Sequence, residues 1–280
     1  MIVGLLSSCN DNDTVLTSDL TLNLTGLEAL GSDYVYEGWV IVDGSPVSTG
    51  TFTSVTFPQT FEVNTSDLNS ATAFVLTIEP AVDPDPAPAD SKLLRGTFSG
   101  RTANVSTEII GDFSTAAGVF FLRTPTDEDV PGGAPNNGND QYGVWFGNPG
   151  MPPTASLVLP TLPAGWAYEG WVVGDSGPIS TGTFTEFGAR DSGNPYSGTV
   201  FNQGPPIPGE DFFNNAPAGE TFPLDVRGRT VVISVEPVPD DSTAPFALKP
   251  LVGTAGQATA PTTHDFGQNL GSLPTGTVTR

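Results

Sequence analysis

Carboxylate side chains carry most of the reactive chemistry of this 280-residue sequence. Four glutamates fall within runs of β-forming residues and form two equivalent pairs: Glu37 with Glu169, and Glu79 with Glu236. Burial raises the pKa of a carboxyl group, so such a residue could act as a general acid or base near neutral pH. A buried carboxylate can instead be structural, when backbone amides or a Ser- and Thr-rich partner strand hydrogen-bond it. We favour the structural role, because a catalytic site usually persists in only one copy of a duplicated unit.

Other acidic residues fall in segments rich in Gly, Pro and Asn. The richest cluster comprises Asp127, Glu128, Asp129 and Asp140. Hard oxygen ligands of this kind suit calcium, which is therefore the one cofactor that the sequence suggests. Neither the EF-hand nor the RTX spacing occurs, so a solvated linker is the alternative. No two carboxylates stand out as the fixed pair that glycoside hydrolysis needs.

The remaining groups that commonly catalyse reactions are scarce. His264 is the single histidine, and its Thr-, Pro- and Gly-rich surroundings predict a solvated loop. A His-rich metal site is therefore excluded. The sequence contains no Gly-x-Ser-x-Gly elbow, no P-loop and no dinucleotide-binding glycine motif. We expect no catalytic residue and no enzymatic activity.

The single cysteine, Cys9, follows a short apolar run and excludes an intramolecular disulfide. Residues 6–9 (Leu-Ser-Ser-Cys) resemble a bacterial lipobox, and the Asn- and Asp-rich residues 10–13 resemble the tether of surface lipoproteins of Bacteroidetes-type bacteria. We expect residues 1–12 to be a signal remnant and tether, with Cys9 acylated and anchored in the outer membrane. The apolar run is short and no Lys or Arg precedes it, so we expect the reading frame to begin upstream. The alternative is an ordinary N-terminus with a buried cysteine.

Composition favours an acidic, all-β protein. Asp and Glu number 31 against 9 Lys and Arg, and the resulting charge of −22 would repel a phosphate backbone, which argues against nucleic-acid binding. Its 33 Gly and 27 Pro are spread between short runs of β-forming residues, a pattern typical of many strands joined by turns. No stretch approaches the roughly 20 apolar residues of a membrane-spanning helix.

An internal repeat organises the sequence. Residues 36–53 recur as 168–185, with 13 of the 18 positions identical, and shorter matches follow in both copies. The offset between copies increases along the chain, which places a long loop insertion at 187–229. We predict two tandem antiparallel β-sandwich units of immunoglobulin-like type. They span residues 13–123 and 142–280, with a linker at 124–141.

Each copy of the repeat predicts a hairpin around a tryptophan. Strands before and after a four-residue turn at 43–46 would place Trp39 opposite Gly50, and the second copy would place Trp171 opposite Gly182. Both tryptophans are expected to be core anchors, with Glu37 and Glu169 on the same face. The alternative is that the indoles stack on a sugar.

The order of these motifs resembles the extracytoplasmic C-terminal domain of the anti-sigma-K factor family. In the second copy the resemblance is carried by a Leu-Pro turn at 157–163, Tyr-Glu-Gly-Trp at 168–171 and Val-Glu-Pro at 235–237. The first copy has Leu-Glu-Ala-Leu at 27–30 in place of the Leu-Pro turn. Family members hold a sigma factor through a cytoplasmic domain joined by a membrane helix, and we expect this chain to represent the outer module alone, duplicated.

These observations predict a non-catalytic cell-envelope lipoprotein with a binding or structural role, exposed on the surface or facing the periplasm. Its partner would be an envelope protein or a glycan. One alternative is a sensor or regulatory partner of an envelope-stress anti-sigma pathway. A second alternative is a carbohydrate-binding or carbohydrate-active protein.

Overall fold

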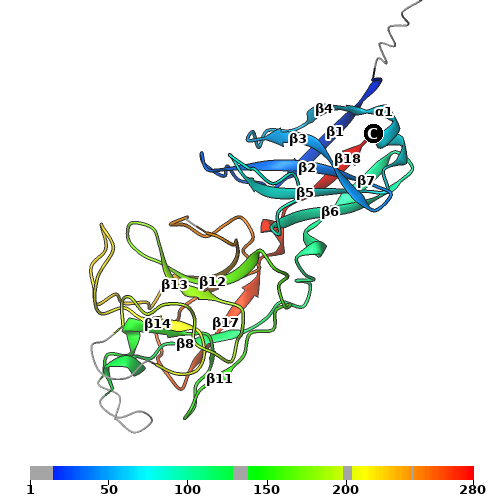
Figure 1. Ribbon diagram of the computed structural model, residues 1–280. Coiled ribbons are helices and arrows are strands. Elements are labelled where there is room, and N and C mark those ends of the chain that lie inside the picture. Colours follow the sequence, from blue (N-terminus) through cyan, green and yellow to red (C-terminus); the bar gives the residue numbers. More distant parts are fainter. Residues whose placement is uncertain (1–14, 129–137, 198–203, 241) are drawn as a thin grey trace, which may run out of the picture.

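The computed structural model describes residues 15–128, 138–197, 204–240 and 242–280. It confirms the all-β prediction, because the chain forms two eight-stranded sheets in which every strand pair is antiparallel. The two sheets lie in separate lobes, as Figure 1 shows. The anchor candidate Cys9 and the calcium candidate Asp129 lie outside the described residues.

The first sheet forms unit one. In spatial order its strands are β3 (Ser45–Phe52), β2 (Tyr34–Val42), β5 (Ala73–Pro80), β6 (Lys92–Ser99), β7 (Thr102–Val105), β18 (Thr275–Thr279), β1 (Thr17–Thr25) and β4 (Gln59–Asn64). Its two outermost strands approach each other, since Phe52 of β3 packs on Phe61 of β4 with ring centroids 5.6 Å apart. The sheet therefore curls around its own core.

The second sheet forms unit two. In spatial order its strands are β13 (Pro178–Phe184), β12 (Trp166–Val173), β15 (Thr230–Pro237), β16 (Leu251–Thr254), β17 (Thr263–Gln268), β8 (Val119–Phe121), β9 (Gly143–Trp145) and β14 (Gly209–Asp211). A separate two-stranded ribbon pairs β10 (Gly147–Asn148) with β11 (Thr154–Ala155). Strand β14 lies inside the predicted insertion at 187–229, which is otherwise mostly loop.

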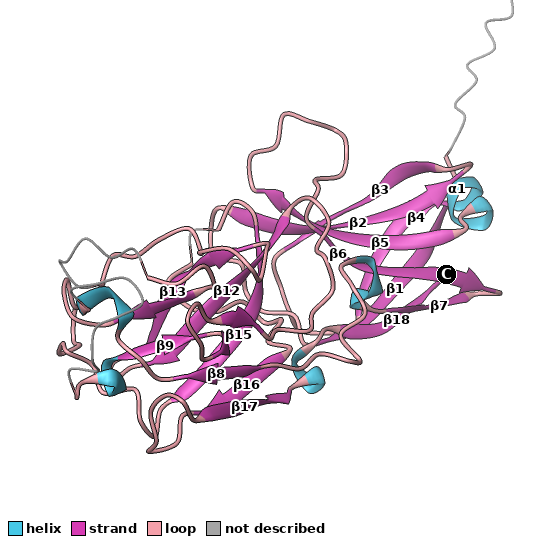
Figure 2. Ribbon diagram, turned by 90° about the horizontal axis from the view of Figure 1, so that it is seen from below, coloured by secondary structure: helices cyan, strands magenta, loops and turns pink. Residues whose placement is uncertain are grey.

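Helices are few and short (Figure 2). They are the α-helix α1 (Thr65–Ser70) and the 3-10 helices η1 (Thr107–Ile109), η2 (Pro125–Asp127), η3 (Asp140–Tyr142) and η4 (Leu270–Ser272). The side chain of Asn64 caps α1 by accepting hydrogen bonds from the first-turn amides. Across the described residues, no helix has the length and hydrophobicity of a membrane span.

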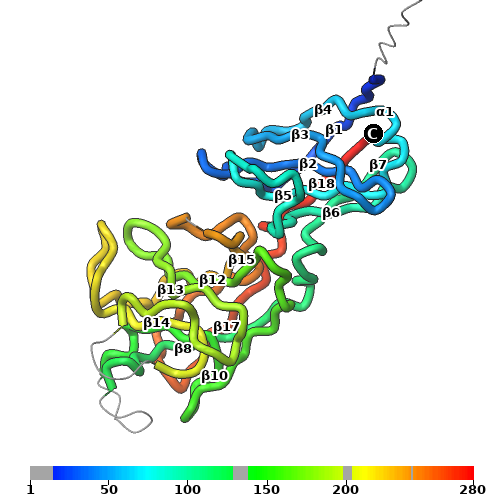
Figure 3. The backbone as a smooth tube through the Cα atoms, in the orientation of Figure 1, coloured from blue at the N-terminus to red at the C-terminus, as the bar shows by residue number. Residues whose placement is uncertain are grey.

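The two units exchange a strand at their boundary. Strand β8 follows β7 in the chain but joins unit two, between β17 and β9. Strand β18 follows β17 but joins unit one, between β7 and β1. Because β7 and β17 hold equivalent places in the two sheets, the exchange is reciprocal. Figure 3 shows both crossings, and the red C-terminal segment ends beside β1 in the other lobe.

This exchange differs from the predicted domain boundaries. The ranges 13–123 and 142–280 assign β8 to unit one and β18 to unit two, and the structure reverses both assignments. The physical reason is that two copies of one unit offer equivalent places to an incoming strand. Pairing in the partner copy satisfies the same backbone hydrogen bonds, so the strand pattern of the sequence does not distinguish the two arrangements.

The hairpin register also differs from the prediction. Strand β2 ends at Val42, and the turn has only two residues, Asp43 and Gly44, with φ of 50° and 81°. Positive φ at both positions is what a type I′ hairpin turn requires. A bulge after Gly38 then pairs Trp39 with Ser48. A bulge after Gly170 likewise pairs Trp171 with Ser180 in unit two.

The glycine at each bulge allows close packing. A Cβ on Gly170 would lie 2.2 Å from the ring of Phe146, and one on Gly38 would lie 3.1 Å from the ring of Phe74. Contacts this short would force the neighbouring rings to move. Trp39 and Trp171 lie beside these glycines and are buried, with 4% and 2% of their surface exposed.

The hydrophobic core is continuous between the units. One cluster of buried apolar side chains includes Leu22, Phe74 and Val278 from unit one together with Tyr168 and Ile233 from unit two. The continuous core and the exchanged strands join both lobes into one body.

Candidate functional sites

A network of tryptophan, hydroxyl and carboxylate occurs in unit one. The Trp39 Nε1 donates to Thr77 Oγ1 at 2.9 Å, and the Thr77 hydroxyl donates to Glu79. The Glu79 Oε1 also accepts from the backbone amide of Ala89 at 2.8 Å. Only 1% of Glu79 is exposed, so its carboxylate ties the end of β5 to the loop before β6.

Unit two repeats this network residue for residue. The Trp171 Nε1 donates to Ser234 Oγ at 2.8 Å, and the Ser234 hydroxyl donates to Glu236. The backbone amide of Phe246 lies 3.0 Å from Glu236 Oε1 and 3.1 Å from its Oε2. Each glutamate precedes the proline that ends its strand, where the sequence predicted a structural role.

The second glutamate pair lies on the neighbouring strands β2 and β12. Ser48 donates to Glu37, and Ser180 donates to Glu169, so each carboxylate is bound by a hydroxyl of the partner strand. Glu37 is half-buried, whereas only 6% of Glu169 is exposed. The Oε2 of Glu169 is buried and accepts no hydrogen bond.

Three carboxylates converge in unit two. Glu169, Glu236 and Asp240 each offer an oxygen within 4.8 Å of the others. Burial raises the pKa of Glu169 to about 7, and the nearby Asp240 adds to the effect. Burial also raises the pKa of Glu236 to about 8, with further contributions from Asp240 and Glu169. Elsewhere in the described chain, no group of three acidic, His or Cys side chains converges this closely.

The carboxylate cluster opens into a cleft between the two units. Glu236 and Asp240 line this cleft of about 400 Å³, and Asp33 and Tyr34 of unit one line its opposite side. Glu28 also lines the cleft, and its pKa is raised mainly by burial, while Lys249 opposes the shift. A small charged ligand or a partner side chain could reach the cluster through this opening.

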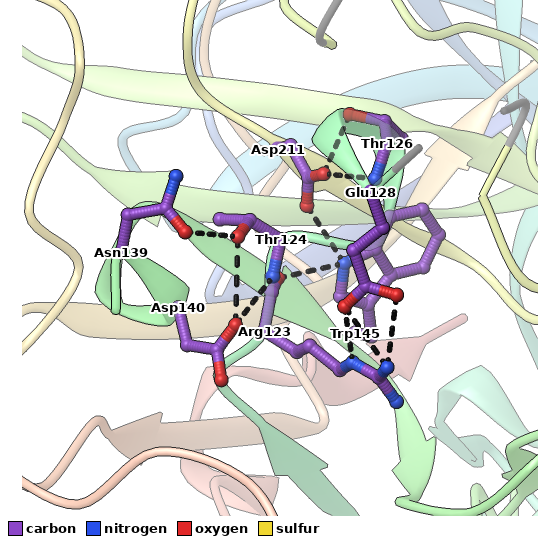
Figure 4. Close-up of polar contacts among 8 residues, drawn as sticks. All are labelled: Arg123, Thr124, Thr126, Glu128, Asn139, Asp140, Trp145 and Asp211. Atoms are coloured by element: carbon purple, nitrogen blue, oxygen red, sulfur yellow. Dashed lines mark hydrogen bonds and ion pairs between the residues drawn. The ribbon is translucent and has the colours of Figure 1, made fainter. Parts of the chain in front are cut away.

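A second polar network lies at the far end of unit two, and Figure 4 shows it. At its centre, Asp211 is fully buried and accepts from the Thr126 amide at 2.8 Å and from its hydroxyl at 2.6 Å. The Trp145 Nε1 donates to the other Asp211 oxygen at 2.9 Å. Burial raises the pKa of Asp211 well above its usual value. These contacts fix η2 against β9 and β14.

The sequence-predicted calcium candidates surround this network but bind protein donors. Arg123 holds Glu128 through two hydrogen bonds of 2.9 Å. Asp140 accepts from the amide and hydroxyl of Thr124 at 3.3 and 3.4 Å (Figure 4). Asp127 accepts from the side-chain amide of Asn139. Among the described residues, these acidic side chains form no group of three converging carboxylates.

Besides Asp211, two further carboxylates in the insertion have raised pKa values, and sequence reasoning did not single them out. Burial raises the pKa of Asp191 to about 8 and that of Glu210 to about 7. Asp191 accepts from the Gly209 amide at 2.9 Å, and the Ser197 hydroxyl donates to Glu210. Both residues stand in loop-like sequence, where nothing in the pattern of neighbours distinguishes them from solvated acids.

An apolar pocket of about 420 Å³ adjoins the ion pair of Arg123 and Glu128. Phe121 and Met151 line it, together with prolines on three segments of unit two: Pro125, Pro152, Pro153, Pro205 and Pro206. Met151 is 67% exposed, so part of this apolar lining faces solvent. The pocket is suited to an apolar side chain of a partner.

The single histidine lies on a strand and not in the loop that we predicted. His264 belongs to β17, and its ring packs on Phe120 with centroids 5.3 Å apart. Its Nδ1 accepts from the Gly256 amide at 3.3 Å, so its Nε2 carries the proton and donates to the Ala258 carbonyl at 3.0 Å. Both ring nitrogens are therefore engaged in hydrogen bonds to the backbone.

Comparison with known proteins identifies one related region. Residues 15–91 match the family described as anti-sigma-K factor rskA, C-terminal. The match contains the Trp39, Thr77 and Glu79 network of unit one and ends just before β6. The match shows that this region is similar to the C-terminal module of anti-sigma-K factors. Neither the curated proteins nor the solved structures contain a match.

Proposed function

We propose that this chain is a cell-envelope lipoprotein whose two units form a non-catalytic binding module. The observation that carries the proposal is the match of residues 15–91 to the C-terminal module of anti-sigma-K factors. That module is extracytoplasmic in the family that the sequence resembles. The lipobox-like residues before Cys9 support the same location. Unit two, which repeats the strand order and the tryptophan network, acts as a second copy of the module.

Two surfaces support a binding role. The inter-unit cleft presents carboxylates from unit two, and the apolar pocket presents Phe121 and Met151 beside an ion pair. Apolar lining combined with a few fixed polar groups is the usual composition of a recognition site. An envelope protein that inserts an apolar side chain into the pocket is the partner we favour over a glycan.

The repetition of the glutamate networks supports a role without catalysis. Glu79 and Glu236 receive the same hydroxyl and amide donors in the two units. A structural residue keeps its role in both copies of a duplication, which accounts for this equivalence. We therefore assign no catalytic residue in either unit.

A sensor in an envelope-stress pathway is the second candidate, and the same family match favours it. In that case the module would bind a membrane-bound regulator, and loss of the chain would change transcription that depends on a sigma factor. A reporter for such transcription, compared in wild-type and deletion strains, separates this candidate from a purely structural role.

Acylation tests the lipoprotein part of the proposal. The chain is expressed from its full upstream reading frame with labelled palmitate, beside Cys9→Ala and the control Ser8→Ala. We expect label in the membrane fraction for the wild type and Ser8→Ala, because alanine keeps a small residue before the cysteine. The Cys9→Ala protein should be unlabelled and soluble. Absence of label from the wild type would refute the anchor.

Photo-crosslinking tests the binding part in cells. A photoreactive residue replaces Met151 at the apolar pocket, and a control replaces Val82, which is 90% exposed in a loop of unit one. We expect a defined adduct with an envelope protein from position 151 and none from position 82. Adducts that are identical at both positions, or that contain only glycan, would contradict a protein partner at this pocket.

A further inference from the structure

The carboxylate of Glu169 has a property that the fold alone does not explain. One oxygen accepts from the Ser180 hydroxyl, but Oε2 is buried without a hydrogen-bond donor, in a residue that is only 6% exposed. Leaving a buried carboxylate oxygen unsatisfied costs free energy. A proton or a bound cation would satisfy this oxygen.

The neighbours of Glu169 are themselves acidic and share a small volume. Oxygens of Glu236 and Asp240 lie within 4.8 Å of one from Glu169 and of each other. Three oxygens at this spacing fit around one ion whose oxygen ligands lie at about 2.3–2.6 Å. Asp240 is solvent-accessible and lines the inter-unit cleft, which gives an ion a route in and leaves room for water ligands.

We propose that Glu169, Glu236 and Asp240 bind a divalent cation, calcium, at the edge of the inter-unit cleft. The donor set consists of carboxylate oxygens, the hard ligands that calcium prefers. Calcium also accepts irregular geometry and several waters, which suits a site with two buried ligands and one at the surface. These residues differ from the acidic loop at 127–140, whose described carboxylates do not converge as a group of three.

Unit one provides the comparison. The residues equivalent to the cluster are Glu37, Glu79 and Asp83, but they do not form a converging group. Asp83 and Asp240 each accept a hydrogen bond from the backbone amide two residues on, at 2.8 and 2.9 Å, but Glu37 is half-buried whereas Glu169 is buried. The cation site is therefore specific to unit two, and Asp83 is a matched control for Asp240.

Protonation competes with the cation. Without an ion, burial raises the pKa of Glu169 to about 7 and that of Glu236 to about 8, so both carboxyl groups bind protons near neutral pH. The other charged groups facing them are Asp240, and across the cleft Glu28 and Asp33, with Lys249 beside Glu28. Calcium must displace the protons, so its affinity increases as the pH rises through the range from about 7 to 8.

Calorimetric titration of the full chain, stripped with EDTA, tests the proposal. We expect the wild type to bind one calcium ion per chain. Asp240→Asn should bind it about tenfold or more weakly, because a charged carboxylate ligand becomes a neutral amide. Asp83→Asn should bind like the wild type. Affinity of the wild type should be higher at pH about 8.5 than at about 6, and magnesium should bind more weakly than calcium.

Three outcomes would overturn the proposal. They are no calcium binding at millimolar concentration, equal loss in Asp83→Asn and Asp240→Asn, or an unchanged affinity in Asp240→Asn. A further variant, Asp140→Asn, shows whether calcium binds instead at the acidic loop at 127–140. Loss of calcium binding in this variant alone would contradict a site at Glu169, Glu236 and Asp240. Asp240 lies in a loop that lines the cleft, so its replacement by asparagine of the same shape leaves the apolar core packing intact.

Discussion

Leu22 of the first strand lies directly opposite Val278 of the last strand, and both side chains are completely buried. The C-terminal strand thus lies within the sheet of the N-terminal unit, flanked by β1 and β7. The reciprocal strand, β8, completes unit two. Each unit depends on the other for one strand, so a ligand in the cleft between them contacts a single interlocked body.

Introducing a charge into the exchanged strand should destabilise the whole chain. We expect Val278→Asp to lower the free energy of unfolding by about 3 kcal/mol or more, because it buries an unpaired charge in the core of unit one. The control Thr279→Asp, at an exposed position of the same strand, should change it by less than about 0.5 kcal/mol. Denaturant unfolding measures both, and equal effects would contradict the placement of β18.

Removing the indole donor should lower the free energy of unfolding by a similar amount in the two units. Trp39→Phe and Trp171→Phe each delete the Nε1 donor to a buried hydroxyl and reduce the packed volume. We expect each substitution to lower the free energy of unfolding by about 1–3 kcal/mol, the usual effect of disturbing a buried hydrogen bond. Thermal unfolding measures this cost. A large effect in one unit and none in the other would show that the networks are not equivalent.

The carboxylate cluster should make stability depend on pH. In the metal-free chain Glu169 and Glu236 have folded-state pKa values of about 7 and 8, above the ordinary value of 4.5. The folded state therefore binds more protons than the unfolded state, and stability falls as the pH rises from about 4.5 to 8. Each group contributes at most about 1.4 kcal/mol per pH unit to this slope.

The substitution Glu236→Gln should make that slope shallower, because glutamine does not ionise. The exposed Glu62→Gln on β4 is the control and should leave the slope unchanged. Unfolding free energies measured across this pH range give the slope for the wild type and for each variant. A wild-type stability that rises with pH in the absence of metal would contradict the buried, protonated cluster.

Much of the fold is predictable from local patterns in the sequence. The short β-forming runs between Gly and Pro predicted an all-β chain, and the repeat of residues 36–53 predicted equivalent hairpins. The side chain of Glu169 was expected to be held by backbone amides or by its Ser- and Thr-rich partner strand, and Ser180 of that strand donates to it. Such features depend on neighbours within one hairpin, which the sequence specifies directly.

Features that depend on distant segments were not predictable. The bulge at Gly38 shifts the register by one residue, and the alternation of residues along the strand does not indicate where a bulge lies. Glu169 and Glu236 converge because β12 pairs with β15 in a register that places Glu169 opposite Ser234. The strand exchange was equally unpredictable from the sequence, because β18 satisfies the same backbone hydrogen bonds in either copy.

The most direct test of the interlocked architecture is the unfolding of unit one with and without its exchanged strand. Residues 15–112 are expressed alone and, in parallel, with residues 270–280 appended through a flexible linker. We expect cooperative thermal unfolding only when the strand is present, because otherwise β1 and β7 each lack their shared partner. Cooperative unfolding of both fragments at the same temperature would contradict it.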